Sequence, residues 1–306
     1  MIAFISTNTI TCGGMIVPFE YISRLKKLGI EADMFAEDGN KELEEFYGFK
    51  VRPLSQLKTT KEDSIIALRW EQCEALSGHE GKKFQLVQGD DLALLGDDTT
   101  RKECSKWRRD ESWQLIGVSP YVLMRWNRGV VIPNGINERF FTNLMLERDI
   151  DILIEGNNEP NKNIGEAIAI AKQVKSAMEK DLKIVWFGRE TYKIDGVENI
   201  SNPKQEEIPK LYQRAKVMIK LSESEGFCLP VLEAMASGCL VATRDMGGND
   251  NFCTHERNCI MENLGNEIKE HLENGKHTWV IERGRMTARE YTWNSSVNKL
   301  LQCLRS

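Results

Sequence analysis

Two acidic side chains lie around an apolar stretch of the chain, ESEGFCLPVLEAMASGCLVA (223–242). They are Glu225 and Glu233. An acidic side chain is costly to bury unless it is paired or hydrogen-bonded. On a solvated face the two carboxylates would have no role in binding a ligand. At the mouth of a binding site, by contrast, they could accept hydrogen bonds from the hydroxyl groups of a ligand.

The segment around these acids predicts a loop followed by a short helix. KLSESEGF leaves a predicted strand, Pro230 suits the first turn of a helix, and Gly238 is expected to end it. Glu225 then lies in the loop and Glu233 about one turn inside the helix, so both can face the mouth of the same binding site. The amide groups at the positive end of that helix are those of Gly226, Phe227, Cys228 and Leu229.

Three further loops follow predicted strands and carry candidate ligand-binding groups. Gly13 and Gly14 precede a helix, where backbone amides can hold a phosphate. Lys162, in EGNNEPNKNIGEA, could reach toward a diphosphate, and Arg189, in WFGRE, comes just after a strand. Each feature alone also has an ordinary explanation: a tight turn, a solvated lysine or a surface arginine.

Strand-like runs alternate with helical patterns almost from end to end. The predicted strands are 2–6, 30–37, 64–70, 83–88, 114–119, 129–137, 149–156, 182–188, 216–222 and 238–244. The predicted helices are 15–29, one opening at Ser119 and Pro120, 165–180, 206–215, the segment after Pro230, and one over roughly 284–304. This order predicts an α/β fold of two doubly wound, Rossmann-like domains that face a cleft and join near PNGINERFF.

Composition limits the class of protein. The apolar fraction of 41% and the charged fraction of 28% are typical of a globular chain, and a net charge of -5 gives no support to a stable nucleic-acid partner. We expect no signal peptide, no membrane span and a cytoplasmic location. The eight cysteines show no CxxC pair, which predicts neither disulfides nor a zinc site: Cys12, Cys73, Cys104, Cys228, Cys239, Cys253, Cys259 and Cys303.

Several of these segments together resemble a known family. The stretch from Glu225 through GFCLPVL to Glu233, followed by AMASGCLVATRDMGG, resembles the E-x7-E signature of the retaining family 4 glycosyltransferases of the GT-B fold (glycosyl transferases group 1). GGMIVPFEYISRLKKLGIEADMF, EGNNEPNKN and the closing AREYTWNSSVNKLLQCL are also similar to parts of that family. The C-terminal half carries the more specific motifs.

The resemblance implies a domain division and roles for the candidate residues. It implies an acceptor-binding domain at 1–140, a nucleotide-sugar-binding domain at 141–285, and a C-terminal helix at 286–306 that packs back on the first domain. Glu225 would contact the hydroxyls of the donor sugar and Glu233 the ribose diol. Lys162 and Gly14 would lie at the diphosphate, and the amides of residues 226–229 would hold sugar and phosphate groups.

Two positions depart from the family pattern. Asn157 stands where the family usually has an arginine, and VQGDD, with Gly89 and Asp90, stands where it often has a histidine. We hypothesise that Arg189 replaces the lost positive charge and that Asp90 orients acceptor or donor hydroxyls. None of the four histidines falls at the family's position: His79, His255, His271 and His277.

The resulting expectation is a metal-independent transferase that moves a sugar from a nucleotide-diphosphate sugar to a hydroxyl with retention at the anomeric carbon. The pairs Asp90–Asp91 and Asp97–Asp98 favour helix caps or solvated charges over metal ligands. Two alternatives stay open: a GT-B nucleotide-sugar epimerase or phosphorylase, and a non-catalytic protein that binds a nucleotide sugar. The acceptor could be a glycan, a lipid-linked carrier or a small molecule. Peripheral membrane contact and the oligomeric state are undecided by the sequence.

Overall fold

The chain folds into two compact units. The structure is a computed structural model and describes residues 1–10, 13–58, 60–61, 63–141, 146–191 and 193–305. Unit 1 consists of Met1–Gly135 together with Trp293–Ser306, and unit 2 is Ile136–Thr292. The sequence-based division was placed a few residues away, at 140/141 and 285/286.

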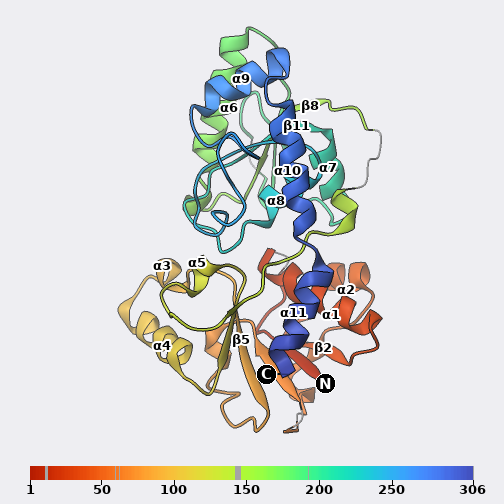
Figure 1. Cartoon of the computed structure of the whole chain (residues 1–306), viewed down its shortest axis with the longest axis vertical. Helices are drawn as coiled ribbons and strands as arrows, with labels where there is room; N and C mark the ends of the chain where they lie inside the picture. Colours follow the sequence, from red (N-terminus) through yellow and green to blue (C-terminus); the bar gives the residue numbers. More distant parts are fainter. Residues whose placement is uncertain (11–12, 59, 62, 142–145, 192, 306) are drawn as a thin grey trace. The chain divides into compact units, whose positions relative to one another are not determined.

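Unit 1 is built on a parallel sheet with the strand order β3-β2-β1-β4-β5-β6-β7. Its elements are β1 (Ile2–Ile5), α1 (Gly13–Lys27), β2 (Ala32–Ala36), α2 (Lys41–Tyr47), β3 (Arg52–Pro53), η1 (Leu54–Gln56), β4 (Ser64–Ala67), η2 (Trp70–Gln72), β5 (Lys82–Val87), α3 (Asp91–Leu94), α4 (Asp98–Arg109), β6 (Gln114–Gly117), α5 (Pro120–Leu123), β7 (Val130–Val131) and α11 (Trp293–Arg305). The last helix, α11, packs beside α1 (Figure 1).

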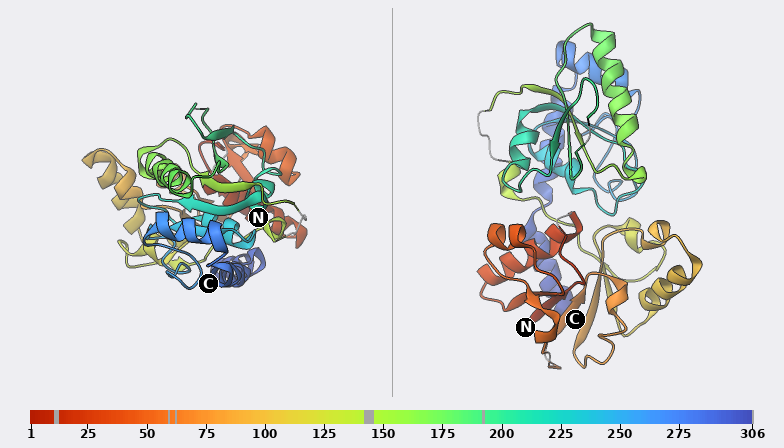
Figure 2. Two further views of the ribbon diagram at one scale, coloured as in Figure 1. Left: turned by 90° about the horizontal axis from the view of Figure 1, so that it is seen from above. Right: turned by 180° about the vertical axis from the view of Figure 1, so that it is seen from behind.

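Unit 2 has a parallel sheet with the order β10-β9-β8-β11-β12. Its elements are η3 (Glu138–Phe140), β8 (Ile150–Glu155), η4 (Pro160–Lys162), α6 (Ile164–Met178), β9 (Ile184–Gly188), β10 (Glu198–Ser201), α7 (Ile208–Arg214), β11 (Ala215–Lys220), α8 (Leu229–Ala236), β12 (Leu240–Thr243), α9 (Leu264–Asn274) and α10 (Thr278–Glu290). Helix α6 covers one face of this sheet, and α8 and α10 lie on the other (Figure 2).

The core of unit 2 explains why its strands read as continuous apolar runs. Ile152 and Ile154 of β8 and Ile219 of β11 are fully buried in one cluster with Ala167 and Ala171 of α6. A parallel sheet covered by helices buries both faces of its strands, so alternation between apolar and polar residues is lost. The expected α/β fold with two Rossmann-like units is confirmed.

The expected C-terminal helix is two helices. The sequence predicted one helix over roughly 284–304, but α10 ends at Glu290 in unit 2 and α11 begins at Trp293 in unit 1. Between them Thr292 is extended and forms a bridge with Ile136, whose amide also donates to the carbonyl of Tyr291 at 2.8 Å. This backbone pairing is incompatible with a continuous helix, because Tyr291 and Thr292 leave the helical conformation to make it.

Other expectations fall near the observed elements. Helix α1 begins at Gly13, two residues before the expected start, and α5 does begin at Pro120 after Ser119. The short strands β3 and β10 were not predicted. In the described part of the chain the cysteines are buried free thiols, and Cys12 lies outside it. Among the helices described, none is both long and apolar enough to cross a bilayer.

Candidate functional site

The loops after β8 and β11 meet at the carboxyl edge of the sheet of unit 2. The two strands are neighbours in the sheet, and the ends of neighbouring parallel strands lie side by side. The amide of Glu223 donates to the carbonyl of Asn161 at 2.8 Å. Lys162 Nζ lies 2.9 Å from Glu225 Oε1. The lysine and the first acid, which the sequence places on separate loops, therefore form an ion pair.

Three donors converge on a single oxygen of Glu225. Besides Lys162, Ser222 Oγ donates to Oε1 at 2.7 Å, and Lys220 Nζ lies 3.3 Å from it. Among the described residues, no hydrogen bond or ion pair reaches Oε2, and the side chain is 17% exposed. Burial alone would raise the pKa of Glu225, but the charges of Lys220 and Lys162 outweigh it and lower the pKa to about 2. The carboxyl group is therefore ionised.

A second ion pair lies beneath this one and was missed by the sequence reasoning. Lys220, the last residue of β11, is buried, and its Nζ lies 2.6 Å from Glu155 Oε2 at the end of β8. Burial would lower the pKa of Lys220, but Glu155 and Glu225 raise it above its ordinary value. A lysine inside the apolar run VMIKL was the signal that could have identified it, because a buried lysine needs a partner.

The loop between Glu225 and α8 has a constrained backbone. Cys228, the N-cap of α8, has φ of 65° and ψ of 60°, in the left-handed region that non-glycine residues rarely adopt. Before it, the buried ring of Phe227 packs against Phe252 and Tyr291, with centroids 5.5 and 5.8 Å away. Left-handed residues cluster at ligand-binding sites, and here the conformation sets the direction of the amides at the start of α8.

Helix α8 is short, as expected, and carries Glu233. It runs from Leu229 to Ala236, and Gly238 follows with φ of 78°. Glu233 is half-buried, one turn inside the helix, and its carbonyl accepts the amide of Ser237 at 3.0 Å. The loop-and-helix arrangement predicted for the two acids is thus observed, with Glu225 before the helix and Glu233 within it.

Gly248 holds the loop of Glu225 in place through the backbone. The amide of Glu225 donates to the carbonyl of Met246 at 2.9 Å, and the amide of Gly248 donates to the carbonyl of Glu225 at 3.0 Å. A Cβ atom on Gly248 would come within 2.3 Å of the carbonyl carbon of Gly226 and 2.4 Å of the oxygen of Glu225. Only glycine permits this close approach.

Asn157 and Arg189 join two loops at the same edge of unit 2. The side-chain oxygen of Asn157 accepts the amide of Arg189 at 3.0 Å. The side chain of Arg189 is 41% exposed, and its Nη2 lies 3.1 Å from Glu159 Oε1. Asn157 therefore links the β8 and β9 loops, and the positive charge of Arg189 is bound to an acidic neighbour of Lys162.

Gly13 and Gly14 form the first turn of α1 in unit 1. Gln88, just after β5, donates from Nε2 to the carbonyl of Gly14 at 2.9 Å. A Cβ atom at Gly13 would meet nothing within 4 Å among the described atoms, so open space adjoins this turn. The glycines are placed where the sequence predicted them, at the start of a helix that follows a buried strand.

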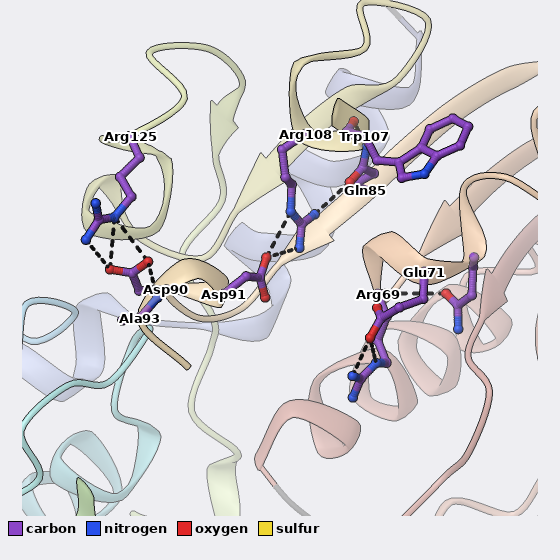
Figure 3. A network of polar contacts seen from close by, with 10 residues as sticks. Arg69, Glu71, Gln85, Asp90, Asp91, Ala93, Trp107, Arg108 and Arg125 are labelled. Carbon is purple, nitrogen blue, oxygen red and sulfur yellow. Dashed lines mark hydrogen bonds and ion pairs between the residues drawn. The ribbon is translucent and has the colours of Figure 1, made fainter. Parts of the chain in front are cut away.

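Asp90 also belongs to unit 1 and lies in a network of polar contacts (Figure 3). It is the N-cap of α3, its Oδ1 accepting the amide of Ala93 at 3.3 Å, and Arg125 Nε lies 3.1 Å from its Oδ2. Its neighbour Asp91 binds the buried Arg108. Asp97 caps α4 in the same way. Asp90 and Asp97 are therefore helix caps, one of the two roles that the sequence favoured for these acidic pairs.

The chain matches a known family over the C-terminal unit. The profile of the family described as glycosyl transferases group 1 matches residues 136–287. A relative from Methanocaldococcus jannaschii, named uncharacterized glycosyltransferase MJ1178, is 24% identical over 235 residues. That match covers 69% of this chain and 64% of the relative, so the chain spans less than two thirds of the relative's length.

Solved structures share the fold over nearly the whole chain. The Anabaena protein Alr3699/HepE, crystallised in complex with UDP and glucose, aligns with a TM-score of 0.81 and 13% identity over 99% of each chain. A sucrose-phosphate synthase from Thermosynechococcus elongatus aligns with a TM-score of 0.75 and 16% identity, covering 99% of this chain and 98% of that one. These likenesses show the GT-B fold.

Proposed function

The chain belongs to the glycosyl transferases group 1 family through residues 136–287, and from this premise we propose that it transfers a sugar from a nucleotide-diphosphate sugar to an acceptor hydroxyl. Transfer proceeds with retention at the anomeric carbon and without a metal ion. The acceptor is a glycan, a lipid-linked carrier or a small molecule. Unit 2 binds the donor and unit 1 the acceptor.

The observation that carries this proposal is the ion pair of Lys162 and Glu225 beside the amides of α8. Glu225 is held ionised by its partners, and its Oε2 is available to accept hydrogen bonds from sugar hydroxyls. Lys162 is 20% exposed, so its ammonium group can reach a ligand. A site with an acceptor for hydroxyls, a cation and the amides of a helix N-terminus matches the groups of a sugar diphosphate.

In this mechanism the lysine and the backbone amides stabilise a charge that forms during the reaction, and the two acids hold the donor in position. The bond between the anomeric carbon and the diphosphate oxygen breaks, giving an oxocarbenium-like transition state. Lys162 and the amides of residues 226–229 stabilise the negative charge on the departing diphosphate. The acceptor oxygen bonds to the same face of the sugar, and its proton passes to a phosphate oxygen. Glu225 orients the sugar, and Glu233 accepts the ribose hydroxyls.

Asp90 is proposed to orient hydroxyl groups in unit 1. Arg125 neutralises its charge without using every lone pair, so the carboxylate can still accept from a ligand. Replacement with asparagine keeps the helix cap, because asparagine and aspartate cap equally well. The expected effect of Asp90→Asn is a higher KM for the acceptor with unchanged donor affinity. Asp97→Asn, at an exposed cap of the same unit, is the matched control.

The test is incubation with a panel of nucleotide sugars and acceptors. UDP-glucose is the first donor, because crystals of the Anabaena relative contain it. Released nucleotide together with a glycoside of the donor's anomeric configuration, in the presence of a chelator, supports the proposal. Glu225→Gln is expected to abolish transfer, whereas Glu223→Gln, an exposed acid in the same loop, is expected to retain it.

Two kinds of result would contradict the proposal. A product of inverted configuration, or activity lost in chelator and restored by a metal, contradicts the retaining, metal-independent mechanism. Donor binding with no transfer to any acceptor supports the alternative of a non-catalytic nucleotide-sugar-binding protein. Asn157 bears on that alternative, since its side chain is used to join two loops and offers no positive charge to the diphosphate.

A further inference from the structure

Lys220 is a buried cation placed between two carboxylates. It is 2% exposed, and its Nζ lies 2.6 Å from Glu155 Oε2 and 3.3 Å from Glu225 Oε1. The side chains before and after it in the chain, Ile219 and Leu221, are also buried. A charged group in such surroundings is retained only with close partners of opposite charge. Lys220 cannot itself contact a ligand in solution, so its effect passes through the two acids.

The ion pairs around Glu225 form a neutral set. Two cations, Lys162 and Lys220, face two anions, Glu155 and Glu225. The two lysines differ in exposure: the side chain of Lys162 is 20% exposed and that of Lys220 only 2%. A diphosphate group that enters from solvent therefore competes with Glu225 for Lys162 and not for Lys220. Without a second cation, that exchange would leave Glu225 as an uncompensated, largely buried carboxylate.

We propose that Lys220 is a positioning residue that keeps Glu225 ionised and in place while Lys162 turns from Glu225 to the diphosphate of the donor. This inference rests on the proposed function. Lys220 already lies 3.3 Å from the same oxygen that Lys162 contacts, so no movement of the backbone is required. Ser222, which donates to that oxygen as well, completes the arrangement that persists after the exchange.

The test removes Lys162 by substitution, so that it needs no substrate. In Lys162→Met, the carboxyl pKa of Glu225, measured by carbon-13 NMR and assigned with Glu225→Gln, is expected to stay below the ordinary glutamate value of about 4.3. Adding Lys220→Met together with Glu155→Gln removes one cation and one anion. No carboxylate then remains at position 155 that would need Lys220 as its partner. In that triple variant the pKa is expected to rise above the ordinary value, because burial then dominates.

Activity gives a second readout in the protein with Lys162 intact. The double variant Lys220→Met/Glu155→Gln is expected to bind donor. As the pH is lowered, however, it is expected to lose activity at a higher pH than the wild type does. If the pKa rises to about 7, roughly nine tenths of the carboxyl is protonated at pH 6, which is about a tenfold loss of kcat. Glu155→Gln alone is the matched control and should keep the wild-type pH profile. Lys220→Arg should restore part of the activity.

The outcomes separate this inference from the proposed function. An unchanged Glu225 pKa on going from Lys162→Met to the triple variant overturns the role of Lys220, whatever the enzyme's activity. A raised pKa in the triple variant, with no transfer by the wild-type protein, upholds the role of Lys220 and refutes the transferase. Circular dichroism of each variant, compared with the wild-type protein, establishes that the pKa values refer to the folded state.

Discussion

Lys162 and Glu225 are 63 positions apart in the chain, and Lys162 Nζ lies 2.9 Å from Glu225 Oε1. One residue ends the short helix η4 and the other lies in the loop before α8. They meet only because β8 and β11 are adjacent in the sheet.

Replacement of Lys162 by alanine is expected to reduce turnover far more than stability. Loss of one preorganised cation at a developing negative charge costs about 10²- to 10³-fold in kcat. The free energy of unfolding should change by less than about 1 kcal/mol, because the pair is partly exposed and Glu225 keeps Lys220 and Ser222. Initial rates and thermal unfolding measure the two effects. Lys172→Ala, at an exposed position of α6, is the control. A large fall in Tm with normal turnover would assign Lys162 to structure.

Replacement of Glu233 by alanine is expected to weaken nucleotide-sugar binding. If its carboxylate accepts the two ribose hydroxyls, the loss should be at least about tenfold in Kd, or about 1.4 kcal/mol. Isothermal titration calorimetry with the donor measures it directly. Glu223→Ala removes an exposed acid from the neighbouring loop and should leave Kd unchanged. Equal donor affinities for the wild-type protein and Glu233→Ala would show that Glu233 does not contact the donor.

Replacement of Gly248 by alanine is expected to affect both stability and binding. The added methyl group would meet the backbone of residues 225–226 at 2.3–2.4 Å, so the loop of Glu225 must shift. Overpacking of this kind costs about 1–3 kcal/mol. Gly265→Ala is the matched control, since its added methyl group would lie 3.9 Å from Gln173, an ordinary contact. Denaturant unfolding and donor titration of both variants check the expectation; a Gly248→Ala protein that behaves as Gly265→Ala does would contradict it.

The stability of the protein should depend on the ionisation of Glu225 in acid. Its pKa falls from 4.5 to about 2 on folding, despite burial, because of Lys220 and Lys162. A depressed carboxyl pKa contributes stability that is complete above about pH 5 and is lost as the pH falls toward 2. The loss is on the order of 3 kcal/mol. The free energies of unfolding of the wild-type protein and of Glu225→Gln, measured between pH 2 and 6, should therefore become equal toward pH 2. A constant difference between them across that range is the opposing result.

The local parts of the site were predictable from the sequence. Pro230 and Gly238 fix the start and end of α8 through their own backbone preferences, so the positions of Glu225 and Glu233 along the chain followed. The alternation of strands and helices likewise predicted two parallel sheets, because it depends only on hydrophobic periodicity. A family resemblance added roles to these residues, and it did so through the same contiguous motif.

Tertiary structure decided which groups meet. Lys220 and Glu155 are 65 positions apart, and only the pairing of β11 with β8 brings them together under Glu225. Asn157, by itself a departure from the family's pattern, accepts a hydrogen bond from the Arg189 amide, and the β8–β9 pairing sets that contact. The break between α10 and α11 depends on the amide of Ile136. Side-chain types and short-range spacing are local properties, whereas the partner of a buried charge or a free amide depends on distant segments of the chain.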